Sequence, residues 1–367
     1  MRRDDETSRR PPLRVSVISP VLNERHHLPA LVDCIEAQTR SPFEAVFADG
    51  GSDDGTREWL EEARQSRPWI QLVANPDRVV SAGLNRAFTA ASGDVVARMD
   101  GHAWYPPDYL ERLVDVLARH PGVVGVGGAL QVKGEGAWGR AIASVLARPI
   151  GLGGAPHRMG RKQGPTYHVG TGMYRRAALL AIGGFDPSFA ANEDFEIDQR
   201  LRDAGGAIWL EPSAWFVSFT RETPRALTAQ MWRYGYYKAR TLWKHPRSLR
   251  LRHLAPPGLV IGLIGLTALR PRRTGQVVLV YLSAAGTAGG LAARADRASP
   301  WRGGLLVPFV HLAWGAGLLA GLASHRGARH EAPRLTAPAS GAPATEVVHP
   351  AELSTPPPSP LGPERQT

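Results

Sequence analysis

The chain has one cysteine in 367 residues, Cys34, so it can form no intrachain disulfide. This excludes the small secreted scaffolds that depend on disulfide frameworks. Aromatic residues make up only 7% of the chain, and no helix-turn-helix, zinc-finger or RNA-binding aromatic signature occurs. Residues 1–12 are charged and lack the apolar segment of a signal peptide. We therefore expect a cytoplasmic domain and no nucleic-acid partner.

An acidic excess is also lacking, because 44 Lys and Arg against 33 Asp and Glu give a formal net charge of +11. Such a balance suits either a nucleic acid or an anionic membrane surface. The basic residues gather beside apolar segments. A basic run precedes the first of these segments and consists of Arg240, Lys244, Arg247, Arg250 and Arg252. Clusters of this kind beside a membrane attract anionic lipids, which favours the membrane surface.

Three apolar stretches follow, at about 255–269, 275–293 and 303–323. The last two approach the ~20 residues that a helix needs to cross a bilayer. The alternative is a helical subdomain that packs on the catalytic core. Because the loops on both sides are basic, the positive-inside rule decides neither the number of spans nor their orientation. We predict a membrane-associated region of two or three apolar helices over 246–325.

The sequence from 48 to 56, Ala-Asp-Gly-Gly-Ser-Asp-Asp-Gly-Thr, follows an apolar run at 43–47 that predicts a buried strand. Ligands of open parallel sheets bind in the crevice at the carboxyl ends of the strands. Glycines let backbone approach a ligand closely, and Asp49 can accept hydrogen bonds from a base or a ribose. The alternative is an ordinary surface turn, since Asp, Gly and Ser dominate turns.

A second predicted strand, over 93–99, ends in Asp100-Gly101-His102. Side chains two residues apart in an extended segment point the same way. A carboxylate beside an imidazole suits a divalent cation, Mg or Mn, that also contacts a diphosphate. The alternative is a strand-end turn with an incidental histidine.

Two further motifs lie downstream. Residues 192–198, Asn-Glu-Asp-Phe-Glu-Ile-Asp, open a predicted helix with an acidic first turn. The helix dipole alone would favour these acids, but one carboxylate could also deprotonate an acceptor hydroxyl. Residues 230–234, Gln-Met-Trp-Arg-Tyr, combine an arginine suited to a diphosphate clamp with aromatics suited to a sugar.

Four motifs in this order over residues 14–245, beginning with Pro20-Val-Leu-Asn23-Glu24, resemble the inverting glycosyltransferases of family 2. The resemblance implies the α/β fold called GT-A, a mixed, mostly parallel sheet flanked by helices. His102 replaces the usual second acidic ligand, and Tyr234 replaces the usual Trp. The Asp-x-His form resembles the succinoglycan glucosyltransferase subgroup, in which the acceptor is a lipid-linked sugar.

The resemblance also implies roles for individual residues. Asp194 is expected as the catalytic base, with Glu193, Gln230 and Arg233 beside it. The predicted donor-nucleotide site comprises Pro20, Asn23, Glu24, Asp49, Gly51, Ser52, Asp53, Arg78, Asn85, Arg98 and Asp100. The predicted sugar and acceptor site comprises Gly170, Thr171, Gly172, Trp232 and Tyr234. Asp100 and His102 are the expected ligands of Mg or Mn. His168 is expected to be structural, and residues 134–165 are expected to form a flexible flap.

The implied domain order is a tail at 1–12, the GT-A domain at 13–245, the apolar helices at 246–325 and a disordered tail at 326–367. The implied reaction moves a hexose such as glucose from a UDP-sugar to an undecaprenyl-diphosphate-linked saccharide, with inversion. It would serve surface polysaccharide synthesis on the cytoplasmic side of the inner membrane, in an assembly complex. Two alternatives are direct transfer to a polyprenyl phosphate and a catalytically inactive scaffold that binds sugar nucleotides.

Overall fold

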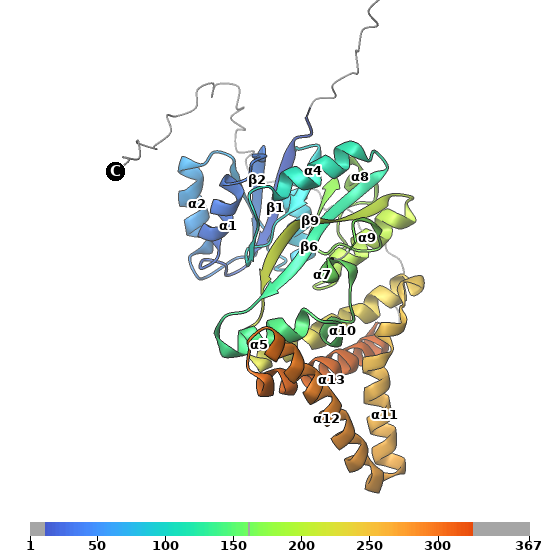
Figure 1. Cartoon of the computed structure of the whole chain (residues 1–367). Helices are drawn as coiled ribbons and strands as arrows, with labels where there is room; N and C mark the ends of the chain where they lie inside the picture. The colour runs from blue at the N-terminus through green and yellow to red at the C-terminus, as the bar shows by residue number, and fades with distance from the viewer. Residues whose placement is uncertain (1–11, 161, 326–367) are drawn as a thin grey trace, which may run out of the picture. The chain divides into compact units, whose positions relative to one another are not determined.

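The structure is a computed structural model that describes residues 12–160 and 162–325 (Figure 1). The predicted tail at 326–367, and all of the predicted tail at 1–12 except Pro12, lie outside the described residues.

Residues 15–98 contain four parallel strands, which lie in the sheet in the order β3-β2-β1-β4. Their bounds are Val15–Val21 for β1, Glu44–Asp49 for β2, Ile70–Ala74 for β3 and Val95–Arg98 for β4. Helices connect them: α1 (Leu28–Glu36), α2 (Thr56–Ser66) and α3 (Val80–Ala90). Strands covered on both faces read as nearly continuous apolar runs, which is why these segments carry few polar residues. Val21 lies opposite Asp49 in the register, so the loops after β1 and β2 are neighbours.

Residues 103–219 supply five more strands and complete a mixed sheet. These strands are β5 (Ala103–Trp104), β6 (Val123–Lys133), β7 (Gly164–Thr166), β8 (Gly172–Arg175) and β9 (Ala207–Phe219). Strand β8 is antiparallel to both β4 and β6, whereas β9 runs parallel to β6. Helices α4 (Tyr109–Arg119), α8 (Arg176–Ala181) and α9 (Glu193–Asp203) flank the sheet. One apolar core lies under α1 and α4, and another under α3 and α9. The predicted GT-A architecture is confirmed.

The prediction of a flexible flap over 134–165 is wrong for the described part of that span. It folds into α5 (Gly136–Leu146), α6 (Pro149–Leu152) and α7 (Pro156–Met159), followed by β7. Helix α5 buries Ile142 and Val145 in a third apolar core that it shares with Leu227 and Met231. Because Gly and Ala are abundant in this segment, its apolar residues show no clear helical spacing in the sequence. The helix is stabilised by the burial of its apolar side chains against other elements.

The remaining helices are α10 (Pro224–Lys244), α11 (Ala255–Leu269), α12 (Pro271–Ala295) and α13 (Pro300–Ser324), with short 3-10 turns η1 (Pro246–Ser248) and η2 (Leu251–His253). Three segments, 251–269, 271–295 and 300–324, are long and apolar enough to cross a membrane. The predicted apolar helical region is thus present as three helices.

Helix α13 packs directly on α10, backbone against backbone. A Cβ atom on Gly317 would lie 2.3 Å from the Trp232 carbonyl oxygen, and one on Gly321 would lie 2.4 Å from that of Tyr236. Glycine is therefore required at these crossings, as is common where helices approach closely. The third core also contains Leu306 and Val310 of α13 beside Met231 of α10. The apolar helices and the sheet domain consequently share a core.

Candidate active site

A cavity of about 800 Å³ opens at the carboxyl end of β4 and extends to α10, α11 and α13. Many of the residues predicted for the site line it. They are Arg78, Arg98, Asp100, His102, Gly170, Thr171, Glu193, Asp194, Gln230, Arg233 and Tyr234. The structure therefore brings together residues that are up to 156 positions apart in the chain (234 minus 78).

The Asp49 loop is organised by its own side chains. The Asp49 carboxylate accepts hydrogen bonds from the Ser52 hydroxyl at 2.7 Å and from the Gly51 amide at 3.3 Å. Asn23, in the left-handed region at φ 56°, accepts a bond from the Asp53 amide at 3.0 Å. The loops after β1 and β2 are thereby tied together. None of these five residues lines the cavity, so their visible role is to shape the loops.

Arg78 connects this loop to the cavity. Its guanidinium donates to the Gly51 carbonyl at 3.2 Å, and its side chain lines the cavity.

The Glu24 carboxylate lies 3.2 Å from Nδ1 of His102, and this hydrogen bond raises the pKa of His102. Pro20 lies in β1 behind the loop and contacts the position of Gly83.

Asn85 does not face the cavity. Its amide donates to the Phe185 carbonyl at 2.7 Å and accepts from the Phe185 amide at 2.7 Å. The residue is 3% exposed, so both ends of its amide are used inside the protein. The predicted donor-binding role must be corrected to a structural one, in which Asn85 fastens α3 to the turn before α9.

A charged triad joins β4 to the start of α9. Nε of Arg98 lies 2.7 Å from Oδ1 of Asp100, and its NH1 lies 2.8 Å from Oε1 of Glu193. Burial raises the pKa of Glu193, and the nearby Arg98 charge opposes this rise. The pairing fixes the first turn of α9 and so brings Asp194 to the cavity beside Asp100.

Asp194 is accessible and has a histidine behind it. Its side chain is 30% exposed, and its Oδ2 lies 3.8 Å from Nε2 of His168. The other ring nitrogen of His168, Nδ1, lies 2.8 Å from Oδ2 of Asp198, whose side chain is fully buried. Asp198 also accepts hydrogen bonds from the Tyr174 hydroxyl and the Val169 amide. Asp198 therefore fixes the orientation of the imidazole, whose Nε2 faces Asp194.

The predicted sugar segment divides into two parts. Gly170, at φ 72°, and Thr171 line the cavity, and the buried Thr171 hydroxyl has no partner among the described residues. Gly172 instead begins β8 and pairs with Gly127 in the sheet. On the other wall, the Gln230 amide donates to the Tyr234 hydroxyl at 3.0 Å.

Trp232 does not line the cavity. It is 45% exposed, and its backbone carbonyl meets Gly317 of α13. The predicted sugar-stacking role of Trp232 is therefore corrected. Gln230, Arg233 and Tyr234 face the cavity because they lie three or four residues apart, on one side of α10, whereas Trp232 lies on another side.

The donor set around Asp100 fits a divalent cation of the kind that a diphosphate helps to hold. No group of three or more His, Cys, Asp or Glu residues that could hold a metal exists in the described ranges. Mg sites at phosphates, however, use one or two carboxylates and complete their shell with phosphate oxygens and waters. Asp100 and His102 both line the cavity and could supply such a partial set.

Several cavity residues carry no signal in the sequence motifs. His157 and Arg158 come from α7, Lys238 from α10 and Arg252 from η2. Arg252 belongs to the basic run that the sequence assigns to a lipid surface. The other three lie outside every motif, and tertiary packing, in which α7 lies against β6 and β9, brings them to the cavity.

The profile of the family described as Glycosyl transferase family 2 matches residues 16–183. The Succinoglycan biosynthesis protein ExoA of Rhizobium meliloti (strain 1021) is 36% identical over 258 residues, which cover 69% of this chain and 77% of that protein. The chain belongs to glycosyltransferase family 2. This glycosyltransferase also resembles the Undecaprenyl-phosphate 4-deoxy-4-formamido-L-arabinose transferase of Pseudomonas savastanoi pv. phaseolicola (strain 1448A / Race 6). That match is 33% identical over 137 residues and covers 36% of this chain and 40% of that protein.

Solved structures support the fold. The mannosyltransferase PcManGT from Pyrobaculum calidifontis, in complex with GDP-Man and Mn2+, has a TM-score of 0.56 at 21% identity. The match covers 84% of this chain and 87% of that one. GalNAc-T7 with UDP, GalNAc and Mn2+ has a TM-score of 0.50 at 17% identity, over 67% of this chain and 50% of that one. Both of those structures hold Mn2+.

Proposed function

We propose that this enzyme transfers a hexose, such as glucose, from a UDP-sugar to a lipid-linked saccharide during synthesis of a surface polysaccharide. The observation that carries the proposal is one cavity that joins three things: the Asp100 region, the exposed carboxylate of Asp194 and the apolar helices α11 and α13. A soluble nucleotide sugar can enter beside Asp100, while an acceptor anchored in a membrane can reach Asp194 from the apolar side. The relationship to ExoA supports a role in polysaccharide synthesis.

The proposed reaction is a single displacement with inversion. Asp194 takes the proton of an acceptor hydroxyl, the hydroxyl oxygen forms a bond to the anomeric carbon, and the bond to the UDP oxygen breaks. The base must act on the face of the sugar opposite the leaving group. Arg233 lines the same cavity and would bind the diphosphate that carries the departing charge, while Arg98, which also lines it, holds Asp100 in place through their ion pair. His168, held by Asp198, would keep the Asp194 carboxylate in place from behind.

A divalent cation would be held by Asp100 together with His102. When bound, it would neutralise charge on the diphosphate of the leaving group. The site of the uridine is assigned to the loops after β1 and β2, with Asp49 as the side chain that shapes the loop and Arg78 as its link to the cavity.

The second candidate is transfer of the sugar directly to a polyprenyl phosphate. Similarity to the undecaprenyl-phosphate transferase over 137 residues favours it. A phosphate nucleophile is already ionised at neutral pH and needs no strong base. The two reactions therefore differ in their need for Asp194.

The enzyme is proposed to act on the cytoplasmic side of the inner membrane, with α11, α12 and α13 as its anchor and an assembly complex around it. Deleting residues 255–323 is a poor test of this location, because it would expose the core shared by Met231 and Leu306. Membrane fractionation of the full chain, with carbonate and detergent extraction, is the suitable test. Recovery in the soluble fraction would contradict the proposal.

The decisive experiment is UDP release by the full-length protein in detergent. A panel of UDP-sugars would be offered with Mg or Mn and a lipid extract, and GDP-mannose would serve as a comparison donor. We expect release from one UDP-sugar, only with extract and only with the cation. Release from GDP-mannose alone would contradict the UDP assignment. Absence of release from every donor would contradict the proposed transfer.

Replacing Asp100 with Ala is expected to abolish the dependence of UDP binding on Mn. The physical reason is that His102 alone leaves the cation without a carboxylate ligand. Titration calorimetry with and without Mn measures this directly. Asp108→Ala is a suitable control, because Asp108 is an exposed acid outside the cavity that pairs with Arg112. An Asp100 variant whose affinity for UDP still rises with Mn would remove Asp100 from the metal site.

A further inference from the structure

One end of the cavity contains three basic side chains from three different elements. Arg158 comes from α7, Lys238 from α10 and Arg252 from η2, and all three line the cavity. We call them the basic group. Lys238 is only 5% exposed, and its Nζ lies 3.6 Å above the ring of Phe195, the residue after Asp194.

The basic group has no acidic partner among the described residues. The other buried cations near the site are paired: Arg98 with Asp100 and Glu193, and Lys244 with Asp186 and Glu196. By contrast, no described carboxylate lies within ion-pair distance of Arg158, Lys238 or Arg252. A buried charge without a partner is costly, so an unpaired group of three that faces a cavity indicates an anionic ligand.

Burial changes the pKa values of two members of the basic group, Lys238 and Arg158. It lowers the pKa of Lys238 to about 7, and the charges of Arg252 and Arg250 act in the same direction. Burial likewise lowers the pKa of Arg158. An anion bound among these groups would relieve both effects. The imidazole of His157, whose buried Nδ1 has no described partner, adds another polar group beside them.

Asp194 is close enough to both sets of cations to act on them. Its charge acts on Arg98, together with those of Asp100 and Glu193, and also on Arg158 and Lys238 of the basic group. The same cavity is also lined by Pro256 at the start of α11 and by Val310 and Trp314 on α13. A ligand here would combine an anionic group with an apolar chain.

We propose that Arg158, Lys238 and Arg252 bind the phosphate groups of the lipid-linked acceptor, which holds the acceptor sugar against Asp194. This inference rests on the proposed function, since it assigns the part of the acceptor that the cavity recognises. Phosphate chemistry is shared with the donor, whose diphosphate is the other possible source of an anion at this position.

Binding measurements on the full-length protein in detergent separate the two sources. Farnesyl diphosphate serves as a short lipid diphosphate, farnesol as the same chain without phosphate, and UDP as the donor product. Lys238→Met and Arg252→Gln are each expected to raise the Kd of farnesyl diphosphate at least tenfold. Their Kd for UDP should stay within about twofold of wild type, as should the Kd for farnesol.

Two variants serve as controls. Arg225→Gln removes the same charge from an exposed position on α10 outside the cavity and should change no Kd. Lys238→Arg keeps the charge and should retain most of the affinity for farnesyl diphosphate, which separates loss of charge from loss of fold. If Lys238→Met does not fold, Arg252→Gln, at the surface end of the group, gives the same readout.

Lys238 also predicts a pH dependence. Its charged neighbours are Asp194 on α9 and Arg250 and Arg252 in and beside η2, and the titratable His253 beside them is neutral over this range because burial lowers its pKa to about 3. An anion would bind the protonated amine, so affinity for farnesyl diphosphate should fall about tenfold between pH 7 and pH 8.5. The phosphate groups of the ligand, with a second pKa of about 6, gain negative charge as the pH rises. Their ionisation alone would therefore increase the affinity with pH rather than decrease it. In Lys238→Arg the fall should disappear.

The outcomes are distinct from those of the UDP-release test. Loss of UDP affinity in parallel with farnesyl diphosphate would reassign the basic group to the donor diphosphate and overturn the inference. Unchanged affinity for farnesyl diphosphate in both variants would also overturn it, even if UDP release had established the transferase. Conversely, weakened lipid diphosphate binding with intact UDP affinity would support the inference without any turnover.

Discussion

Asp194→Asn is expected to reduce UDP release by about a hundredfold to ten-thousandfold, the usual contribution of a positioned general base. The amide has nearly the shape of the carboxylate but cannot accept the proton of the acceptor hydroxyl. Because Asp194 lies outside the loops after β1 and β2, the Kd for UDP should remain within about twofold. Single-turnover UDP release with the lipid extract, combined with calorimetry for UDP, measures both quantities.

Asp203→Asn is the matched control, because Asp203 lies on the same helix and its side chain is 58% exposed. It should retain wild-type turnover. The result also separates the two candidate acceptors, since a phosphate nucleophile would leave Asp194→Asn with most of its activity. Unimpaired release by Asp194→Asn would therefore favour polyprenyl phosphate as the acceptor and remove Asp194 as base.

His168→Gln tests whether the histidine behind Asp194 matters to the reaction. Glutamine can keep one hydrogen bond to Asp198 but cannot bridge to Asp194, so we expect a loss of about tenfold in kcat with little change in KM for the donor. A merely structural role would lower thermal stability and leave kcat of the folded protein unchanged. Melting temperature and kcat measured on the same preparation distinguish these roles.

The motifs that lie at strand ends and helix starts could be predicted because local chemistry determines them. Asp100 and Asp194 follow apolar strands or open an acidic helix, and both line the cavity. The same logic failed for Asn85 and Trp232, since adjacency in a motif does not say which way a side chain faces. Asn85 bonds the Phe185 backbone, and Trp232 lies on a different side of α10 from Arg233.

Residues that reach the site through tertiary packing could not be predicted. Arg158 lies in a segment without helical period, and Lys238 lies one turn beyond the recognisable motif on α10. Both line the same cavity because α7 packs on β6 and β9 while α10 supplies another wall, an arrangement that no local pattern encodes. Likewise, Gly317 and Gly321 read as ordinary membrane-helix glycines, yet they are the contacts that join α13 to the helix of Arg233.

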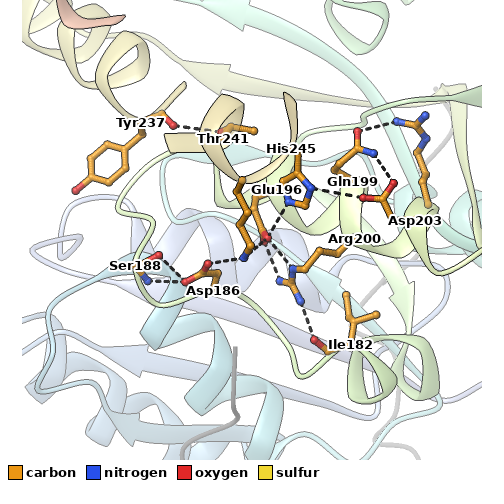
Figure 2. Close-up of polar contacts among 12 residues, drawn as sticks. Ile182, Asp186, Ser188, Glu196, Gln199, Arg200, Asp203, Tyr237, Thr241 and His245 are labelled. Atoms are coloured by element: carbon orange, nitrogen blue, oxygen red, sulfur yellow. Dashed lines mark hydrogen bonds and ion pairs between the residues drawn. The ribbon is translucent and has the colours of Figure 1, made fainter. Parts of the chain in front are cut away.

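The second large effect is expected at Glu196, which is completely buried and joins α9 to the end of α10 (Figure 2). Its Oε1 lies 2.7 Å from Nζ of Lys244 and 2.7 Å from Nε of Arg200. Lys244 also pairs with Asp186 at 2.6 Å. Figure 2 shows Asp186, Arg200 and His245 gathered around Glu196. This network holds the helix of Asp194 against the helix of Gln230 and Arg233.

Burial alone would raise the pKa of Glu196, but hydrogen bonds from His245 and Arg200 and the charges of Arg200 and Lys244 lower it to about 2. A carboxyl whose pKa is 4.5 when unfolded and about 2 when folded contributes about 3 kcal/mol of stability at neutral pH. Because the folded pKa is the lower one, the contribution is complete above pH 4.5 and is lost as the pH falls toward 2.

Glu196→Gln is therefore expected to destabilise the folded protein by about 3 kcal/mol at pH 7. The reason is that Arg200 and Lys244 would lose the negative charge of Glu196, and Lys244 would keep only its ion pair with Asp186. The difference from wild type should shrink as the pH is lowered below 4.5, where wild type loses the same contribution. Asp203→Asn, which removes an exposed carboxylate that also contacts His245, should cost less than about 1 kcal/mol at any pH. Urea unfolding in detergent at pH 7 and pH 3.5 measures the three proteins side by side. A Glu196→Gln protein as stable as Asp203→Asn at pH 7 would show that the network contributes nothing to holding α9 against α10, and the placement of Asp194 would then depend on the Arg98 pairing alone.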